Sequence, residues 1–410
     1  MKVLHVTQNY YPSLGGTQHT MKKISECLHA QYNDKVTVIT TNSLYGPNNA
    51  TFKKIEEKET FINGVHVKRF GFFRAHKPLL KLVSKASVKM SGKGLPESVA
   101  TLSMGPFSAS MKKAIETTDA DIICASSVHY RFADYGLYRK NIPNPKPFVL
   151  YGALHLETGQ VPAKYIQRIK AADHYIANTL YEKEFLIKQG MQAAKITVAG
   201  AATDILEQEI HYDEDVRKAS GINADKKIIL CISRQEAFKG LPVLIDAFSQ
   251  LQQEEKNSCL VIAGAKGTYS SALQEAAKNI QNLFVLTDIP QHTKCMLLQA
   301  AAIVVLPSKE ESFGVVFLEA WSFKKPVIGT RIGAIASLIE ENKDGYLFEP
   351  GNVSELAMQI KRMISDNNKA QQMGAAGFEK VQQHYTWDKI TATFRAAYIQ
   401  AIETFHQQKN

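Results

Sequence analysis

Short, almost continuously apolar runs alternate along the chain with longer segments in which apolar residues recur every three or four positions. In the first half, the apolar runs are residues 2–7, 35–41, 120–126, 147–153 and 174–179. In the second half, they are residues 227–233, 259–264, 283–287, 301–308 and 325–330. Apolar runs separated by helical segments predict parallel strands that helices bury on both faces. The pattern therefore predicts an α/β fold.

The chain has 410 residues, which is more than one hydrophobic core usually organises, so we expect two domains. The polar, acid-rich segment 201–227 precedes a fresh series of strands and marks the expected boundary. We predict two doubly wound, Rossmann-like domains over residues 1–205 and 206–385. The last segment, about 386–410, has the apolar spacing of one amphipathic helix that begins near Trp387.

The composition excludes several classes of protein. Hydrophobic residues make up 45% and charged residues 21%, as in soluble globular proteins. The five cysteines are scattered and never spaced C-x-x-C, which argues against disulfides and against zinc. No apolar window is long enough for a signal peptide or a membrane span. We therefore expect a protein of the reducing cytoplasm.

Two glutamates, Glu311 and Glu319, are separated by seven mostly apolar residues. The preceding run predicts a strand and residues 312–323 predict the next helix. Glu311 is thus expected in the loop or at the helix cap, and Glu319 about two turns inside the helix. Ligands of doubly wound sheets bind at this kind of strand end.

The start of the same predicted helix is a candidate phosphate site. The backbone N–H groups of Phe313, Gly314 and Val315 have no partner within a helix and carry partial positive charge. Gly314 has no Cβ, so an anion can approach the backbone closely. Such a turn between two acids is suited to a sugar nucleotide, because carboxylates accept hydrogen bonds from hydroxyl groups on both sides of the diphosphate.

Two cations, Arg234 and Lys239, follow the predicted strand 227–233. They suit a diphosphate and the negative charge that grows on a leaving nucleoside diphosphate. Two glycines, Gly15 and Gly16, follow the first strand and allow a tight turn, but the spacing is not G-x-G-x-x-G, so no nicotinamide site is predicted. Each of these features also has a structural reading, as a surface charge or an ordinary turn.

Several stretches together carry a resemblance to a known family. They are "PSKEESFGVVFLEAWSFKKPVIGTRIGAIASLIEENKDGYLFEPGN" (307–352), "CISRQEAFKG" (231–240), "YYPSLGGTQHTMKKISECL" (10–28) and "GALHLETG" (152–159). The chain resembles the retaining glycosyltransferases of family 4, which have the GT-B fold. It departs from them at "IGAIAS", where a Gly-Gly pair is frequent, and at "ATD", where Gly-Val-Asp is more usual.

The resemblance implies two domains that face each other across a cleft. The N-terminal domain would bind the acceptor and the C-terminal domain the nucleotide-sugar donor, while the last helix packs back on the N-terminal domain. It also implies roles for single residues: Glu311 on the donor sugar, Glu319 on the ribose, Arg234 and Lys239 on the phosphates, Gly15 and Gly16 near the donor phosphate or the acceptor, and His155 facing the transferred sugar. His129 and Asp204 are weaker candidates.

The formal net charge of +10 is concentrated in residues 67–93, which contain eight basic residues and no acid. Five of them recur at every fourth position and would form one helical stripe: Lys77, Lys81, Lys85, Lys89 and Lys93. The segment is typical of a helix on an anionic membrane surface or of a solvated helix packed on its own domain. Nucleic-acid binding is less favoured, since no binding motif accompanies the charge.

The sequence thus predicts a retaining, metal-independent glycosyltransferase of the hexosyltransferase type that needs no cofactor. Its donor would be a UDP- or GDP-sugar, and its acceptor a glycan or lipid-linked molecule of cell-surface polysaccharide synthesis. The enzyme would be cytoplasmic, free or at the inner face of the membrane. The alternatives are an enzyme with a soluble acceptor, a sugar-nucleotide epimerase, and a non-catalytic binder of nucleotide sugars.

Overall fold

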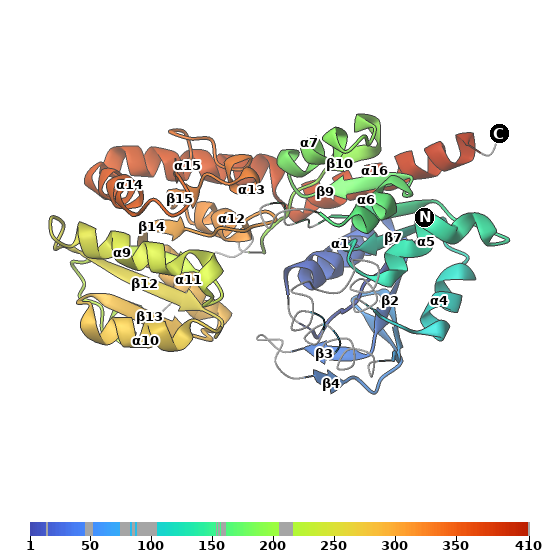
Figure 1. The fold of residues 1–410 in the computed structure, drawn as a ribbon, viewed down its shortest axis with the longest axis horizontal. Helices are drawn as coiled ribbons and strands as arrows, with labels where there is room; N and C mark the ends of the chain where they lie inside the picture. Colours follow the sequence, from blue (N-terminus) through green and yellow to red (C-terminus); the bar gives the residue numbers. More distant parts are fainter. Residues whose placement is uncertain are drawn as a thin grey trace. The chain divides into compact units, whose positions relative to one another are not determined.

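The computed structural model describes residues 1–13, 15–45, 52–73, 83, 87, 105–152, 154, 156, 161–204 and 216–408. The chain forms two compact units (Figure 1). The first consists of Met1–Leu154, Gly159–Ala199 and Ile390–Asn410, and most of the second is Gly200–Lys389. The chain therefore passes between units at residues 199–200 and 389–390, where the sequence placed the boundaries at 205 and 386.

The first unit contains an eight-stranded sheet in the order β10-β9-β8-β7-β1-β2-β6-β5. Its strands are β1 (Lys2–Val6), β2 (Lys35–Thr41), β5 (Glu59–Ile62), β6 (Val65–Phe70), β7 (Ile122–Ser126), β8 (Phe148–Tyr151), β9 (His174–Ala177) and β10 (Ile196–Val198). All neighbours are parallel except β5 and β6. The main helices are α1 (Gly16–Tyr32), α4 (Ala109–Glu116), α5 (Tyr135–Tyr138), α6 (Ala163–Lys170) and α7 (Leu180–Lys188). A small antiparallel ribbon pairs β3 (Ser43–Tyr45) with β4 (Phe52–Lys54).

The second unit contains a fully parallel six-stranded sheet in the order β13-β12-β11-β14-β15-β16. Its strands are β11 (Lys227–Ile232), β12 (Ser258–Gly264), β13 (Leu283–Thr287), β14 (Ala301–Leu306), β15 (Val327–Thr330) and β16 (Gly345–Phe348). Its helices are α8 (Val216–Ala219), α9 (Leu241–Leu251), α10 (Ser270–Asn279), α11 (Gln291–Ala300), α12 (Val315–Ser322), α13 (Gly333–Ala336), α14 (Val353–Ser365) and α15 (Asn367–His384).

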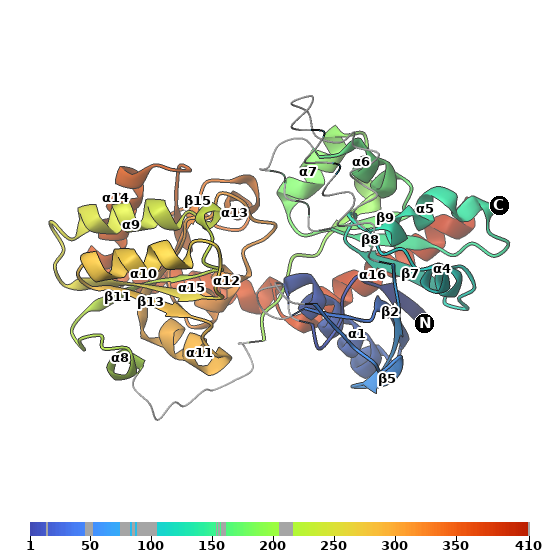
Figure 2. The ribbon, with the colours of Figure 1, turned by 60° about the horizontal axis from the view of Figure 1, so that its bottom comes forward.

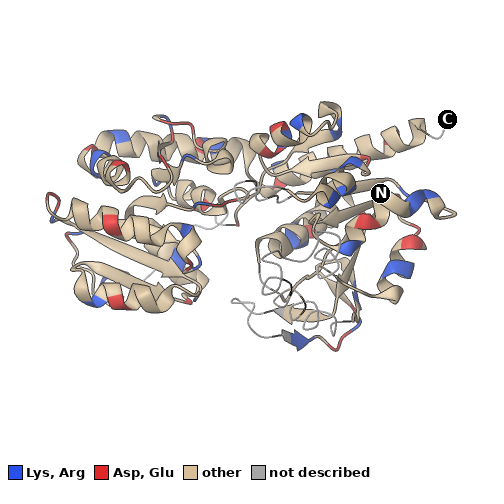
Figure 3. Ribbon diagram, viewed as in Figure 1, with Lys and Arg blue, Asp and Glu red and all other residues tan. Residues whose placement is uncertain are grey.

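Both faces of the second sheet are buried. In β11, Ile228 and Leu230 join one apolar cluster, whereas Ile229 and Cys231 join the cluster on the opposite face. Figure 2 shows α9 and α10 on one side of the sheet and α11 on the other. The strands are almost free of charged residues, which lie on the helices and loops (Figure 3). Burial on both faces explains why the strands read as continuous apolar runs rather than alternating ones.

The C-terminal helix α16 (Trp387–Gln407) packs on the first unit along most of its length. Phe394 and Tyr398 are fully buried, and the Phe394 ring lies 5.1 Å from the ring of Tyr151 on β8. Arg395 donates a hydrogen bond of 3.0 Å from Nε to the buried carboxylate of Asp34. The apolar face that the sequence pattern indicates is thus covered by the first sheet.

A buried histidine joins α16 to the first strand. His5 on β1 shares hydrogen bonds with Ser25 Oγ on α1 (2.7 Å) and with Tyr398 Oη on α16 (2.9 Å). Burial lowers the pKa of His5 to about 3, from an ordinary value of 6.5. His174, on β9, is affected in the same way, and its pKa falls to about 4. Both imidazoles are therefore neutral in the folded protein at neutral pH.

We expect the free energy of unfolding of the first unit to decrease as the pH falls from 7 to 5. Below the unfolded-state pKa of 6.5 the unfolded chain binds protons that the folded chain excludes, so acid favours unfolding until the folded pKa is reached. For His5 alone, the loss by pH 5 is roughly 2 kcal/mol. Urea titrations at pH 7, 6 and 5 measure it. His5→Gln should flatten the dependence of the free energy of unfolding on pH, whereas His406→Gln, at an exposed position, should not. The same pH dependence in both variants would contradict the assignment of the effect to His5.

The sequence analysis did not predict a β-hairpin at the edge of the first sheet. β5 and β6 are joined by Asn63 and Gly64, both with positive φ, 48° and 82°. Asn-Gly between apolar residues is a strong hairpin signal. The hairpin also changes the interpretation of the basic segment, because Lys68 lies 3.6 Å from Glu59 and Arg69 is buried, 3.6 Å from Glu57. These two cations are neutralised and do not belong to a free basic surface.

Among the helices that the structure describes, none combines the length and the apolar character needed to cross a bilayer. The stripe from Lys77 to Lys93 lies outside the described residues. Its membrane or solvent role therefore stays a prediction.

Candidate active site

The topology of the second sheet creates a switch point at its carboxyl edge. From β11 the chain proceeds outward through β12 and β13, and then returns to β14 on the other side of β11. The loops after β11 and β14 consequently leave the edge in opposite directions, and ligands of open α/β sheets bind at such a switch point. The predicted donor residues of the second half lie on these two loops and on α12, which follows the second loop.

Close contact between the two loops is made possible by a glycine. Gly240, which precedes α9, has a φ of 74°, and a Cβ at this position would lie 1.8 Å from the carbonyl oxygen of Pro307. Nearby, the backbone N–H of Lys309 donates to the carbonyl of Phe238 at 3.0 Å. The loops after β11 and β14 therefore pack backbone to backbone. This contact places the residues of one loop against those of the other.

The first acid of the pair is bound to one of the predicted cations. Lys239 Nζ lies 2.5 Å from Glu311 Oε1, and the two side chains are only 17% and 15% exposed. The sequence analysis assigned both residues to the donor but did not pair them with each other. The two charges cancel, so a diphosphate that binds Lys239 must share it with Glu311 or displace it.

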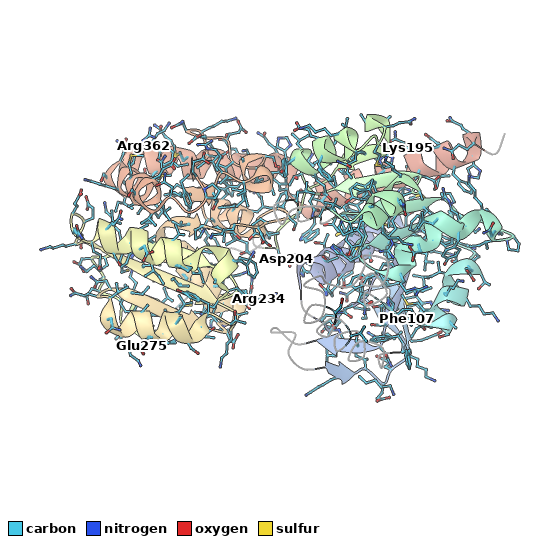
Figure 4. The ribbon with its side chains drawn as sticks, viewed as in Figure 1. Phe107, Lys195, Asp204, Arg234, Glu275 and Arg362 are labelled. Atoms are coloured by element: carbon cyan, nitrogen blue, oxygen red, sulfur yellow. The ribbon has the colours of Figure 1, made fainter. Side chains whose placement is uncertain are left out.

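The other predicted cation is arranged differently. Arg234 lies just beyond β11 and is exposed (Figure 4). Within the part of the chain that the structure describes, no carboxylate lies within ion-pair distance of its guanidinium. Arg234 is thus open to solvent, whereas Lys239 is already paired with Glu311.

A residue that the sequence analysis missed holds this edge of the sheet together. The Gln235 side chain is fully buried; its Nε2 donates to the Leu286 carbonyl at 3.2 Å and its Oε1 accepts from Thr287 Oγ1 at 3.3 Å. Its backbone N–H donates to Ala265 at 2.9 Å and its carbonyl accepts from Tyr269 at 3.0 Å. Gln235 therefore fixes the position of Arg234 relative to the loop after β12 and to the end of β13. In the sequence, the only indication of this role was the position of Gln235 next to Arg234, an expected donor-binding residue.

The tip of α12 has the form expected of an anion site. Gly314 caps the helix with a φ of 96° and provides no side chain to the first N–H groups. Phe313, by contrast, is 4% exposed, and its ring packs 5.6 Å from the ring of Tyr385. Only the backbone of Phe313 is thus left for a ligand. Val315, the first residue of the helix, is exposed.

The second acid lies closer to the helix start than the sequence analysis placed it. Because Gly314 is in the left-handed region, α12 begins at Val315, and Glu319 is one turn inside rather than two. Its Oε1 lies 2.6 Å from Nζ of Lys294 on α11, with both side chains largely buried. Lys294 was missed, since nothing in the local pattern of α11 links it to α12.

In the first unit, the loop after β1 is also at a switch point, because β1 lies between β7 and β2. Gly15 has a φ of 150° and a ψ of 157°, a backbone conformation that residues with a Cβ rarely adopt, so this position favours glycine. Gly16 begins α1 and would have no atom within 4 Å of a Cβ. Only Gly15 therefore has a structural reason to be glycine.

The weaker candidates both have structural partners. His129 Nδ1 and Ser127 Oγ are 2.7 Å apart after β7, and the His129 ring lies 4.9 Å from Tyr165. Asp204 accepts a 2.7 Å hydrogen bond from the Trp387 indole. His155 lies outside the described residues, so its sugar-facing role stays a prediction. Among the described residues, no group of three His, Cys, Asp or Glu side chains is placed to hold a metal ion.

Comparison with known proteins agrees with this geometry. Residues 213–380 match the family model described as glycosyl transferases group 1. D-inositol 3-phosphate glycosyltransferase of Kribbella flavida is 28% identical over 253 residues, 58% of this chain and 59% of that protein. N-acetyl-alpha-D-glucosaminyl L-malate synthase of Bacillus anthracis is 25% identical over 241 residues, 57% of this chain and 60% of that protein. The matched region thus spans about three fifths of these relatives.

Solved structures resemble the chain over nearly its whole length. Anabaena HepE in complex with UDP superposes with a TM-score of 0.70 at 19% identity, covering 97% of this chain and 99% of that one. Sucrose-phosphate synthase from Thermosynechococcus elongatus gives a TM-score of 0.73 at 18% identity, covering 98% and 99%. The solved structures show the expected GT-B fold, and the match of residues 213–380 to the group 1 model supports the expected enzyme class, a glycosyltransferase.

Proposed function

We propose that the protein transfers a sugar from a nucleotide-sugar donor to a glycan or lipid-linked acceptor in surface-polysaccharide synthesis, with retention of anomeric configuration and without a metal ion. The observation that carries the proposal is the ion pair of 2.5 Å between Lys239 and Glu311 at the switch point beside the tip of α12. This pair supports the proposal, because a cation suited to a phosphate and a carboxylate suited to sugar hydroxyls lie close enough together for one donor to contact both.

The donor would bind with its diphosphate at the tip of α12. The N–H groups after Gly314 and the guanidinium of Arg234 hold the phosphate oxygens, and Lys239 joins them when the anion competes with Glu311. Glu311 then accepts hydrogen bonds from hydroxyls of the transferred sugar, and Glu319 from the ribose. Lys294 keeps the Glu319 carboxylate in place from α11. A uridine donor is the first choice to test, because structures of HepE contain UDP and UDP-glucose.

The chemical step needs charge stabilisation more than covalent catalysis. The acceptor oxygen forms a bond to the anomeric carbon as the bond from that carbon to the phosphate oxygen breaks, and the acceptor proton passes to the leaving phosphate. Negative charge then grows on the diphosphate, where Arg234, Lys239 and the helix tip stabilise it. These cationic groups are the support for transfer without a metal ion.

A soluble acceptor is the second candidate. The names of the two curated relatives contain inositol 3-phosphate and malate, which are small anionic molecules. This observation favours the same chemistry on a free acceptor. Transfer to water-soluble polyols or hydroxy acids, assayed beside transfer to a membrane extract, separates the two candidates.

We expect a nucleotide sugar to raise the melting temperature of the protein. At a concentration of 100 times Kd, a bound donor stabilises the folded state by about 2.7 kcal/mol. A thermal-shift panel of UDP-, GDP- and ADP-sugars measures the effect and identifies the base. Arg234→Gln should lose most of the shift, whereas Arg362→Gln, on the outer surface of α14, should retain it. If no nucleotide sugar raised the melting temperature, the proposed function would be wrong.

A further inference from the structure

The residue before the tip of α12 packs against the segment through which the chain leaves the second unit. Phe313 directly precedes Gly314, is 4% exposed and belongs to an apolar core cluster of this unit. Tyr385, the residue after α15, packs against the same cluster. The two rings meet edge to face, with 5.6 Å between their centres and 69° between their planes. The tip of α12 is therefore supported by a residue that lies far from it in the sequence.

The segment through which the chain enters the second unit meets the same two rings. Gly200, the first residue after the crossing, is buried and has a φ of 77°. A Cβ at this position would lie 2.9 Å from Cε1 of Tyr385 and 3.3 Å from Cε2 of Phe313. Both distances are shorter than the optimal separation of two carbon atoms, so the close approach depends on glycine. Gly200, Phe313 and Tyr385 thus pack together at one point.

A hydrogen bond also joins the two connecting segments. Nε1 of Trp387 donates to Oδ1 of Asp204 at 2.7 Å, and Figure 4 labels Asp204. Trp387 is 6% exposed and lies two residues after Tyr385, while Asp204 lies four residues after Gly200. Within the second unit, the entering and leaving segments therefore contact each other both at Tyr385 and at Trp387.

The position of Phe313 affects the N–H groups to which we assign the diphosphate. Gly314 has wide conformational freedom, so the residues on its two sides must hold its backbone in the left-handed conformation. On one side is α12, and on the other is Phe313, whose ring is fixed by Tyr385. N–H groups that are already oriented bind an anion without a further cost of ordering.

We propose that Tyr385 is a positioning residue for the donor, which couples the tip of α12 to both connecting segments. Tyr385 acts through Phe313 and does not itself contact the donor. The inference rests on the proposed function, because it requires the diphosphate to bind at this tip. It adds a reciprocal effect: a ligand at the tip stabilises the contacts around Gly200 and Tyr385 by the same factor by which those contacts strengthen its binding.

The first test compares aromatic truncations near the two ends of α12. Tyr385→Ala should weaken binding of UDP, or of GDP or ADP if UDP does not bind the wild type, by about tenfold in calorimetry on the full chain. Phe323→Ala is the matched control, because Phe323 is a partly buried aromatic residue that packs against the same cluster but caps the C-terminal end of α12. It should leave the Kd unchanged.

A conservative variant separates positioning from stability. Tyr385→Phe keeps the ring that contacts Phe313 and should bind the nucleotide as the wild type does. Melting temperatures are recorded for all variants, and both alanine variants are expected to melt lower, so the Kd alone decides. An unchanged Kd in Tyr385→Ala, or equal weakening by Phe323→Ala, would overturn the proposal.

A second pair of variants reaches the same contact from Gly200. Gly200→Ala should weaken nucleotide binding by several-fold, because the new methyl group displaces the rings of Tyr385 and Phe313. Gly221→Ala is the control, since Gly221 has a similar φ of 70° but no atom within 4 Å of a Cβ. If both variants bound the nucleotide with the same Kd, the contact at Gly200 would have no part in positioning the tip.

Hydrogen exchange measures the reciprocal effect. The backbone N–H of Tyr385 donates to the Val381 carbonyl at 2.8 Å, and its exchange reports local opening at the end of α15. The nucleotide should slow exchange in residues 381–389 of the wild type by several-fold and have a much smaller effect in Tyr385→Ala. Exchange in α14 should not change in either protein. Exchange in residues 381–389 that is indifferent to the nucleotide would refute the coupling.

These measurements distinguish failure of the inference from failure of the proposed function. If the wild type bound none of UDP, GDP and ADP, the proposed function would be wrong and the role of Tyr385 would fall with it. If the wild type bound one of them and Tyr385→Ala bound it equally well, only the role of Tyr385 would be wrong.

Discussion

Glu311→Gln is expected to lower the rate of sugar transfer by about 100- to 1,000-fold while UDP binds as tightly as before or several-fold more tightly. The loss follows from the removal of one preorganised charged contact to the reacting sugar, for which mutations of comparable groups give this range. The gain for UDP follows from the ion pair of 2.5 Å, because the amide no longer competes with the diphosphate for Lys239. If Glu311 were only a surface charge, its substitution would change neither the rate of sugar transfer nor the affinity for UDP.

The measurement compares kcat for the donor identified in the thermal-shift panel with the Kd for UDP from calorimetry. Glu275→Gln is the control, since Glu275 is exposed on α10 and, among the residues that the structure describes, forms an ion pair only with the exposed Lys278. It lies on the second unit away from the candidate site (Figure 4). A variant at Glu311 that transfers sugar at the normal rate, or that binds UDP tenfold more weakly, would refute the arrangement proposed for the donor.

Gly240→Ala is expected to lower the free energy of unfolding of the second unit by roughly 2–4 kcal/mol more than Gly221→Ala does. The two glycines have nearly the same backbone conformation, with φ of 74° and 70°. A Cβ at Gly240 would lie 1.8 Å from the Pro307 carbonyl oxygen, whereas a Cβ at Gly221 has no atom within 4 Å. The difference between the variants thus isolates the collision between loops from the cost of the left-handed conformation.

Urea unfolding followed by circular dichroism gives the two free energies, and calorimetry with UDP gives the effect on the site. Gly240→Ala should also weaken UDP binding, because separation of the loops after β11 and β14 moves Lys239 away from the tip of α12. Equal destabilisation by the two substitutions would show that the loops are not held together by backbone contact at Gly240.

Much of the fold could be predicted because its signals are local. The strand expected at 283–287 is β13 (Leu283–Thr287), and that expected at 227–233 ends one residue earlier, at Ile232. Each is an apolar run that needs only its neighbours in sequence to be recognised. The β5–β6 hairpin was missed although its Asn-Gly turn is local, because Lys68 and Arg69 interrupt the apolar pattern of β6, which alternates buried and half-buried positions instead of forming a continuous apolar run.

The sequence by itself determined which residue types are proposed for the candidate site: the glycine that caps α12, the two acids around it, and the cations after β11. The tertiary structure decided their partners. Lys239 and Glu311 are 72 residues apart, and they meet because β11 and β14 are paired in parallel and Gly240 lets their loops touch. Lys294 reaches Glu319 because α11 and α12 pack on the same face of the second sheet. Local patterns report which face of an element is buried, whereas the pairing of side chains depends on strand order and helix packing, which no short stretch of sequence contains.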